Sequence, residues 1–565
     1  MTSTVESGTG RRTGNGAESG PRAPDAALAR LAPRLAGLRA GLAVPAEAGR
    51  KEAPGAGEAP ALTSGRSADR ETREVRVAFT GGLLARLPCA GPADVEQAAA
   101  RVRAAAAEWA RRAPRDRARP LWRFHDLLLD RMDEVLDIVQ LETGKARRHA
   151  FEELVDALLS VRWYAARASR LLAPRRRRGA LPPLTRTRVY REPWGLVGLI
   201  VPWNYPLALT AGDVAPALLA GNGVLLKPDL QTTHTAALVA DLLAEAGVPR
   251  DLVAVVPGEG PVAGAAVVDA ADFVAFTGGT ETGRAVARRA AGRLRVASLE
   301  LGGKNSLIVL PGADLRRAVD GAVRGAFANA GQLCIGTERI LVHRDVHDEF
   351  LARLAARVGA LRLGATLDWS ADVGSLTSAA QLARVRAHVE DAVARGAVVR
   401  AGGRARPEIG PWFFEPTLLT GVDLEADAFR EETFGPVASV RPFATEDEAV
   451  ELANHGRLGL NASIWSRDPR PARRIARRLQ AGTVNVNEAY AAAWGSLAAP
   501  MGGMRDSGSG RRHGPEGLLR FAQSRTVAEQ RLLPLDAAGP WVARPGLRRL
   551  AVLYLRASRR LPGLR

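Results

Sequence analysis

Residues 195–228 read GLVGLIVPWNYPLALTAGDVAPALLAGNGVLLKP, and this stretch decides the fold. Its two apolar, strand-sized runs at Gly195–Val201 and Val224–Leu226 begin an alternation of strands with helices that continues to residue 310. Further strands are predicted at Leu252–Val256, Phe273–Phe276 and Leu307–Leu310, a helix at Thr233–Ala246, and later strands at Ile340–Val342, Ala438–Pro442 and Gly482–Val486. Short apolar strands that alternate with helices are typical of an α/β fold with a parallel sheet.

The N-terminal extension lacks such a pattern. Residues 1–70 are rich in Gly, Ala, Pro and scattered charge, so we expect a mostly disordered segment. Pro33 should confine any helix there to its later part, although helical spacing is present at Leu31, Leu35, Leu38 and Leu42.

Two helices and a hairpin are predicted before the alternating region. Asp94 can cap a helix that continues to about Arg112, and a second helix is expected over about Pro120–Val139. Residues 171–192 contain the charge run Arg175–Arg178, which we interpret as a solvated hairpin tip rather than a binding patch.

The C-terminal residues 545–561 form a separate amphipathic pattern. Arginines lie largely off an apolar face that carries Leu547, Leu550, Ala551, Tyr554 and Leu555. We favour docking of this face on the protein itself or on a partner subunit; contact with a membrane surface is the alternative.

Composition excludes several classes of protein. The 565 residues carry a net charge of +19, but only four of the basic residues are lysine, which indicates a general bias toward arginine rather than a binding site for nucleic acid. No secretory signal and no run of about 18 apolar residues is present, so we expect a cytoplasmic protein without a membrane span. The two cysteines, Cys89 and Cys334, are too few for a disulfide framework or a multi-cysteine zinc site.

Cys334 is a candidate nucleophile. It lies in NAGQLCI, which begins at Asn329, and Gly331 and Gly336 beside it favour an irregular turn that presents the sulfur to a cleft. A lone cysteine is more often a buried, inert side chain. Cys89, in LPCAG, has no polar sequence neighbours, and we interpret it as structural.

Glu300 and Asn204 are candidates for acid–base work and oxyanion binding. Glu300 lies between two leucines, a setting that raises the pKa of a carboxyl toward that of a general base, although a solvated surface glutamate is the alternative. Asn204 lies in PWNYP, where two prolines fix the backbone at a strand end. A rigid amide there can donate to an oxyanion or serve only a turn.

Glycine-rich turns indicate a phosphate site. The segment FTGGTETG at Phe276–Gly283 follows a predicted strand and opens a helix, the context in which backbone amides hold phosphate. Lys227, directly after another strand, can reach a ribose or phosphate, or be an ordinary surface lysine. His343 and His347 lack a third ligand, so we expect no metal site.

Together these segments resemble the aldehyde dehydrogenase superfamily over roughly residues 85–530. The motifs, in chain order, are PWNYP from Pro202, KP from Lys227, FTGGTxxG from Phe276, LELGGK from Leu299, GQxC from Gly331, EETFGPV from Glu431 and PMGGMxxSG from Pro500. Within the superfamily the chain is most similar to the NADP-type succinate-semialdehyde dehydrogenase group.

The resemblance implies a mechanism. The Cys334 thiolate would attack an aldehyde, with the oxyanion held by the Asn204 side chain and the Cys334 backbone N–H; hydride transfer to nicotinamide would leave a thioester, which Glu300 would hydrolyse through an activated water. The family positions that hold NADP or NAD correspond here to Trp203, Asn204, Lys227, Leu230, Gly278, Gly279, Leu301, Glu432 and Phe434.

The resemblance also implies the domain organisation. A Rossmann-type cofactor domain over 85–302 would carry an oligomerisation hairpin at 171–192, and an α/β catalytic domain would follow over 303–510. A β oligomerisation arm would be completed by a strand within 518–531, before the basic tail at 532–565. A homodimer or homotetramer is expected.

Two departures from the family bear on specificity. Leu230 stands where many NAD-preferring relatives have a glutamate, so a 2′-phosphate meets no like charge and we expect NADP to be favoured; Gly279 stands where a serine is common. Gly212 and Ala328 stand where succinate-semialdehyde dehydrogenases place arginines. Either another arginine binds the distal carboxylate, or the substrate is a less polar medium-chain or aromatic aldehyde, which the apolar Ala491–Trp494 favours.

Two other classes of function are compatible with parts of the sequence. Cys334 and Glu300 could form a cofactor-independent thiol esterase or hydrolase, and the arginine run with the basic tail could serve a non-catalytic surface-binding protein. Neither accounts for the joint presence of the motifs around Asn204, Glu300 and Cys334.

Overall fold

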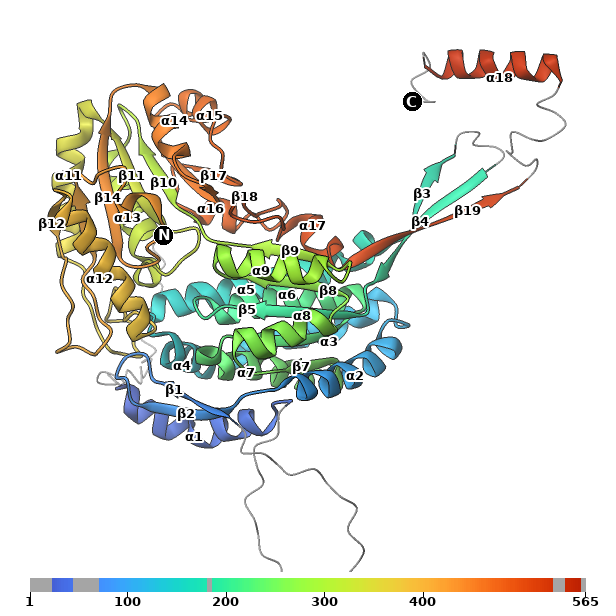
Figure 1. The fold of residues 1–565 in the computed structure, drawn as a ribbon, viewed down its shortest axis with the longest axis horizontal. Coiled ribbons are helices and arrows are strands. Elements are labelled where there is room, and N and C mark those ends of the chain that lie inside the picture. The colour runs from blue at the N-terminus through green and yellow to red at the C-terminus, as the bar shows by residue number, and fades with distance from the viewer. Residues whose placement is uncertain (1–22, 44–70, 180–184, 532–543, 560–565) are drawn as a thin grey trace, which may run out of the picture.

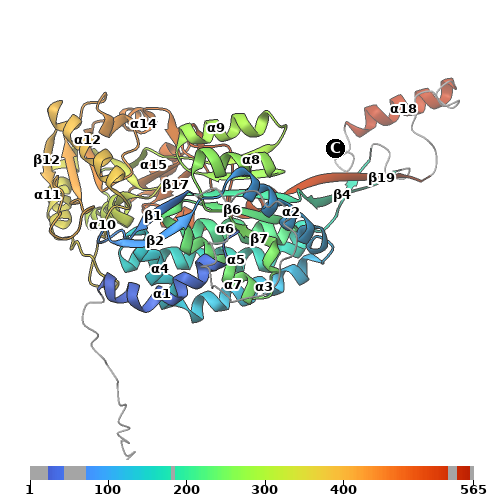
Figure 2. The ribbon, with the colours of Figure 1, turned by 60° about the horizontal axis from the view of Figure 1, so that its bottom comes forward.

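The computed structural model describes residues 23–43, 71–179, 185–531 and 544–559. Two lobes lie side by side, and an arm of β-strands projects from one of them (Figure 1). Each lobe is built on its own sheet with helices packed around it (Figures 1 and 2), so the predicted α/β class is confirmed.

The first lobe contains a five-stranded parallel sheet. Its strands, in spatial order, are β7 (Val253–Val255), β6 (Gly223–Pro228), β5 (Leu196–Val201), β8 (Phe273–Thr277) and β9 (Val296–Glu300). The connecting helices are α6 (Pro206–Ala220), α7 (Thr233–Glu245), α8 (Ala265–Ala270) and α9 (Thr280–Ala291). The predicted strands of this region are confirmed. Strand β9 was not predicted, because its sequence VASLE has no continuous apolar run.

The second lobe contains a seven-stranded sheet. Its order is β12 (Val398–Ala401), β13 (Thr417–Thr420), β14 (Val437–Phe443), β11 (Thr337–His343), β10 (Asn305–Val309), β16 (Asn461–Trp465) and β17 (Thr483–Val486). Only the β12–β13 pair is antiparallel. The helices are α10 (Leu315–Phe327), α11 (Arg344–Gly359), α12 (Ala379–Ala394), α13 (Asp427–Arg430), α14 (Glu446–Asn454), α15 (Pro469–Ala476) and α16 (Ala491–Trp494). Because β9 ends at Glu300 and β10 begins at Asn305, the chain passes from the first sheet to the second within residues 300–305.

The helices that precede the first sheet are α2 (Pro92–Trp109), α3 (Pro114–Asp130), α4 (Met132–Thr143) and α5 (Arg147–Leu172). A single helix over Pro120–Val139 is therefore wrong, since the chain turns at Arg131 between α3 and α4. The helical spacing of apolar residues continues across this turn because Leu128 of α3 and Val135 of α4 pack in the same core. Asp94 lies at the third helical position of α2 rather than at the cap, and its Oδ2 accepts the N–H of Gly91 at 3.0 Å.

A helix forms in the segment predicted to be disordered. Helix α1 (Pro24–Ala40) contradicts that expectation for residues 23–43; residues 1–22 and 44–70 lie outside the described parts of the chain. It contacts α4 and α7, and Arg34 bridges Glu134 at 2.7 Å and Asp241 at 2.9 Å. Burial of Leu31, Leu35 and Leu38 in the same core offsets the cost of about 3 kcal/mol for Pro33 inside the helix.

The arm is a three-stranded antiparallel sheet. Strand β4 (Thr185–Pro193) pairs with β19 (Ala522–Gln530) on one side and with β3 (Arg175–Arg178) on the other, and all four arginines of β3 are exposed. The remaining elements are β1 (Thr72–Arg76), β2 (Leu83–Pro88), β15 (Leu458–Gly459), β18 (Met504–Arg505), α17 (Gly514–Leu519) and α18 (Pro545–Ser558). None of the helices described is long and apolar enough to cross a bilayer.

The packing of α1 can be tested by Leu35→Ala. Removal of a buried leucine side chain costs about 3 kcal/mol, which corresponds to roughly 100-fold faster hydrogen exchange of the α1 amides. The exposed Ala36→Ser is the matched control and should leave exchange within a few-fold of wild type. Equal exchange in both variants would contradict the packing of α1 on the core.

Candidate active site

A pocket of about 440 Å³ lies between the two lobes, at the carboxyl ends of β5, β8 and β9. Of the residues predicted from the sequence, the pocket is lined by Trp203, Asn204, Gly278, Gly279, Glu300, Leu301, Cys334, Glu432 and Phe434. Carboxyl ends of parallel strands form ligand sites in α/β proteins, so this placement follows from the topology. Lys227 and Leu230 are not among the lining residues.

The backbone around Cys334 is held by side-chain amides. The Nδ2 of Asn305 donates to the carbonyl oxygens of Cys334 at 2.8 Å and Gly336 at 2.7 Å. Just before the cysteine, Asn329 and Ala330 adopt left-handed conformations with φ of 51° and 52°. This irregular turn was predicted from the neighbouring glycines. It leaves Cys334 partly exposed to the pocket.

Asn204 is fixed through both its backbone and its side chain. Its carbonyl accepts from the Nζ of Lys145 at 2.8 Å and from the Nδ2 of Asn329 at 3.1 Å, and its own Nδ2 donates to the carbonyl of Gln332 at 3.2 Å. Asn204 is therefore tied to the turn that carries Cys334. Each amide nitrogen has two protons, so one proton of Asn204 Nδ2 remains for the pocket.

Loss of solvation dominates the electrostatics of Cys334 and Glu300. Burial raises the pKa of Cys334 to about 12; the negative charge of Glu432 acts in the same direction, and Arg512 opposes it. Burial raises the pKa of Glu300 to about 7, again against the field of Arg512. The Oε1 of Glu300 is buried without a hydrogen-bond partner among the described residues. This oxygen is consequently available to a water or a thiol.

Arg512 was not recognised in the sequence. One of its nitrogens donates to Asp213 Oδ2 at 2.7 Å and to Thr277 Oγ1 at 2.8 Å. Its positive charge thereby lies close enough to lower the pKa of both Glu300 and Cys334. Because 212 residues separate Arg512 from Glu300, only the folded chain brings these groups together.

The loop that carries Glu432 and Phe434 lines the same pocket as Glu300. Glu432 Oε1 accepts the N–H of Gly303 at 2.8 Å, and a side chain on Gly302 would collide with the Glu432 carboxylate. Burial raises the pKa of Glu432 to about 8, with Glu338 as the next cause. The ring of Phe434 lies edge-on to Trp203, with centroids 5.4 Å apart.

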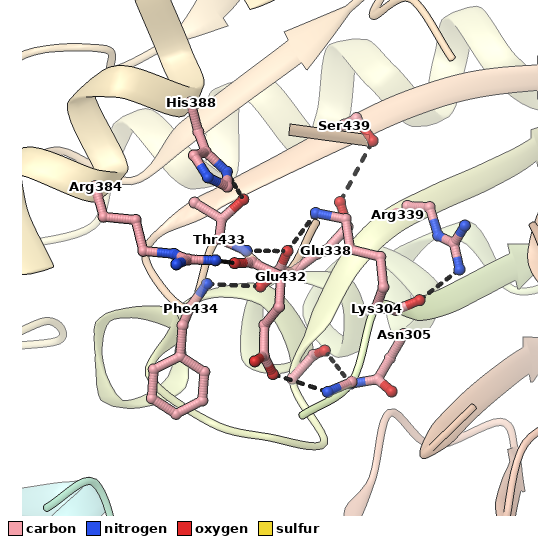
Figure 3. Close-up of polar contacts among 12 residues, drawn as sticks. Lys304, Asn305, Glu338, Arg339, Arg384, His388, Glu432, Thr433, Phe434 and Ser439 are labelled. Carbon is pink, nitrogen blue, oxygen red and sulfur yellow. Dashed lines mark hydrogen bonds and ion pairs between the residues drawn. The ribbon is translucent and has the colours of Figure 1, made fainter. Parts of the chain in front are cut away.

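A buried ion pair supports this loop. Lys304 pairs with Glu338, whose carboxylate also accepts the N–H groups of Thr433 at 2.9 Å and Phe434 at 2.8 Å (Figure 3). Phe434 has φ of 54°, so its backbone is strained and needs such support. Glu338 therefore sets the position of Glu432 and Phe434. No sequence pattern pointed to Glu338. Its carboxylate accepts the N–H of Thr433, which lies 95 residues later in the chain, so its role depends on the fold.

Further pocket residues gave no signal in the sequence. Gln381 and Arg384, on α12, bond the carbonyls of Phe434 and Glu432, and Arg457 pairs with Glu281 at 3.0 Å and Glu431 at 3.5 Å. In the sequence these residues lie on ordinary polar faces, which do not distinguish them from other surface side chains.

The surroundings of Lys227 correct the interpretation of Cys89. Burial lowers the pKa of Lys227, and charges from Asp229, Glu259 and Cys89 oppose that shift. Cys89 is half-buried. Loss of solvation raises the pKa of its thiol, and the negative charges of Glu259 and Glu71 raise it further. Its apolar sequence neighbours therefore concealed charged neighbours in space.

The N-terminus of α9 faces the pocket. Gly279 is the N-cap residue, and an added Cβ there would meet open space, so residue 279 does not obstruct an anion at this helix end; the first turn also carries Glu281, which is paired with Arg457. The N–H of Gly278 donates to the carbonyl of Glu300 at 3.1 Å, which ties the turn to β9. The glycine-rich turn therefore opens a helix at the pocket, and the binding of phosphate by its N–H groups stays a prediction.

The other side of Cys334 is apolar. Cys334 packs against a cluster of apolar side chains that we call the apolar wall. The wall consists of Tyr205, Ala208, Leu209, Ala328, Leu333, Ile335, Leu460, Ala489, Tyr490, Ala491, Trp494 and Met501. Trp494 lies 6.3 Å from the ring of Tyr205 and 6.0 Å from that of Tyr490. Behind the wall, Tyr490 donates to Glu152 at 2.9 Å, and burial raises the pKa of Asp156 to about 7.

A cysteine, a buried carboxylate and a glycine-rich helix N-terminus thus lie together in one pocket between the lobes, an arrangement compatible with a nucleotide-dependent enzyme. A model of the aldehyde dehydrogenase family matches residues 66–527, so the chain belongs to that family and is an oxidoreductase that acts on aldehydes.

Named relatives agree with the family. A Mycolicibacterium smegmatis protein named "Putative succinate-semialdehyde dehydrogenase (NADP(+))" is 52% identical over 83% of this chain and 90% of its own length. A 4,4'-diapolycopene aldehyde oxidase of Methylomonas sp is 40% identical over 81% and 87%. The crystal structure of succinate-semialdehyde dehydrogenase from Burkholderia pseudomallei superimposes with a TM-score of 0.78 at 35% identity, covering 81% of this chain and 95% of that one.

The support of the loop by Glu338 can be tested with two variants. Glu338→Gln should raise the KM for the dinucleotide roughly 10- to 100-fold, because charge-assisted hydrogen bonds to the loop are weakened. The variant also leaves Lys304 buried without its partner, which lowers stability. In Lys304→Met/Glu338→Leu the buried charge is gone, so the unfolding temperature should recover while the KM stays raised. Recovery of both would show that the pair is structural only.

Proposed function

We propose that the protein oxidises an aldehyde to a carboxylic acid through a covalent thioester on Cys334. The observation that carries this proposal is the buried, unpartnered Oε1 of Glu300 in the pocket that Cys334 lines. The Cys334 thiol gives its proton to Glu300, which releases it to solvent before the hydrolysis step, and the sulfur attacks the carbonyl carbon. The free amide proton of Asn204 and the Cys334 N–H then stabilise the resulting oxyanion.

Glu300 also accepts a proton in the hydrolysis step. After the substrate carbon has been oxidised, a water beside Oε1 gives its proton to Glu300 and attacks the thioester, which releases the acid and returns the thiol. A carboxyl with a pKa of about 7 is suited to this step near neutral pH. The esterase alternative uses Cys334 and Glu300 without a nucleotide, so it assigns no function to the α9 turn or to the loop that carries Glu432.

The remaining pocket residues fit a nicotinamide dinucleotide, which when bound accepts hydride from the substrate. Gly278 and Gly279 would hold its pyrophosphate, Glu432 and Phe434 its nicotinamide half with Trp203 and Leu301, and Lys227 its ribose. We propose NADP as the favoured form, because Leu230 presents no carboxylate to a 2′-phosphate. The name of the Mycolicibacterium smegmatis relative supports this preference.

The substrate we propose has an apolar chain. The apolar wall surrounds Cys334, Gly212 and Ala328 supply no cation, and the acidic Glu152 and Asp156 lie behind the wall. Arg512 and Arg324, whose charges reach groups around the pocket, already pair with Asp213 and Glu488. Among the described residues, neither of these two arginines is then free to bind a distal carboxylate. Succinate semialdehyde is the second candidate, on the names of the relatives at about half identity.

The wider organisation of the protein is also part of this proposal. The division into a cofactor domain over 85–302 and a catalytic domain over 303–510 is supported by the change of sheet between Glu300 and Asn305. The exposed strands of the arm favour a homodimer or homotetramer. A cytoplasmic location agrees with the small number of cysteines.

The pH dependence tests the role of Glu300. Steady-state turnover should fall as the pH drops below about 7, because protonated Glu300 cannot accept the proton of water. Glu300→Gln should lower turnover at least 100-fold and abolish this inflection, while Glu432→Gln should keep it. An unchanged inflection in Glu300→Gln would assign the titration to another group.

Cofactor preference depends on the charge at residue 230. Leu230→Glu should lower the ratio of kcat/KM for NADP to that for NAD at least tenfold, because the new carboxylate repels a 2′-phosphate. Leu230→Gln has nearly the same shape without the charge and should change the ratio much less. A wild-type enzyme that strongly prefers NAD would contradict the assignment.

Substrate preference should depend on whether a positive charge lies beside the apolar wall, where residue 212 is a glycine. Gly212 lies one turn after Ala208 on α6, with open space where a Cβ would be, so Gly212→Arg can place a guanidinium beside the apolar wall. This variant should raise kcat/KM for succinate semialdehyde relative to hexanal at least tenfold; Gly212→Met is the uncharged control. Wild-type turnover of succinate semialdehyde far above that of hexanal would exclude the apolar substrate.

A further inference from the structure

The C-terminal helix α18 separates apolar from basic side chains. At 100° per residue, one side of Pro545–Ser558 carries Leu547, Leu550, Ala551, Tyr554 and Leu555, with Leu553 at its edge, and the other side carries Arg548, Arg549 and Arg556 together with Val552. The helix begins at Pro545, a residue type preferred at a first helical position. The amphipathic pattern of the sequence is therefore a formed helix.

The apolar face of α18 is not buried against any of the residues that the structure describes. No residue of the helix is buried, and Leu550, Leu553 and Leu555 are 63%, 63% and 66% exposed. The helix lies beyond the arm, away from both lobes (Figures 1 and 2). Docking on its own subunit, the arrangement favoured from the sequence, is therefore not observed among the described residues.

Charge narrows the choice of partner for this face. After Asp536 the chain contains arginines but neither aspartate nor glutamate, and the whole protein carries +19. The nearby strand β3 adds four exposed arginines (Figure 1). A second copy of this chain would bring further positive charge to the same place, whereas an anionic surface neutralises it.

We propose that α18 is an interfacial helix that holds the enzyme on an anionic lipid surface. The leucine face enters the boundary between headgroups and acyl chains, and the arginines contact lipid phosphates. The 14 residues of α18 are fewer than the about 20 needed to span a bilayer, so the helix lies in the plane of the surface. This places the enzyme where aldehydes with apolar chains accumulate.

Flotation of the full-length protein with lipid vesicles tests the proposal. The protein should float with vesicles of phosphatidylcholine containing 30% phosphatidylglycerol at least tenfold more than with pure phosphatidylcholine. Leu550→Gln/Leu553→Gln keeps every arginine and should lose this binding, as should Arg548→Gln/Arg549→Gln. Oxidation of a water-soluble aldehyde should be unchanged in both variants, since α18 buries nothing in the enzyme.

Matched variants distinguish insertion of α18 from adsorption of a basic protein and from pairing of two copies. Arg115→Gln/Arg119→Gln removes the same charge from residues that are 80% and 78% exposed on α3, and it should float like wild type. Binding that survives Leu550→Gln/Leu553→Gln would mean simple adsorption and would overturn the proposal. Absence of wild-type binding would also overturn it; a smaller oligomer in the leucine variant would then identify a second copy as the partner.

Discussion

The hydrogen bonds made by residues 300–305 hold the two lobes in register at the pocket. This segment ends β9 with Glu300 and begins β10 with Asn305, whose Nδ2 fixes the carbonyl of Cys334. The N–H of Gly303 fixes the carboxylate of Glu432 from the other side. Cys334, Glu300 and the loop that carries Glu432 are thus positioned by six consecutive residues. Glycines at 302 and 303 are required because the Glu432 carboxylate and the carbonyl of Cys334 approach their backbone closely.

The same enclosure sets the chemistry. Withdrawal from water keeps the Cys334 thiol protonated and brings Glu300 close to half ionisation near neutral pH, so a proton acceptor of suitable strength stands in the pocket with the thiol. Arg512 moderates both shifts. Glu300 still titrates before Cys334, as a free glutamate does before a free cysteine.

Local patterns in the sequence revealed the fold class, most parallel strands and many of the residues that line the pocket, because strand period and motif spacing are local properties. Groups that act across the fold could not be found in this way: Glu338 and Arg512 have meaning only through partners in other elements. Apolar periodicity also failed at Arg131, since α3 and α4 enter one core across a turn. Composition misled at α1, where buried leucines and paired arginines outweigh a disorder-prone sequence. At Cys89, apolar neighbours in sequence hid charged neighbours in space.

The most direct test of this account is the location of the acyl group during turnover. Glu300→Gln enzyme should be mixed with NADP and hexanal, quenched in acid, and digested for mass spectrometry. The account predicts that the peptide containing Cys334 gains the mass of a hexanoyl group and that the peptide containing Cys89 does not. NADPH formed in one equivalent without acylation of Cys334, or an acyl group on Cys89, would contradict it.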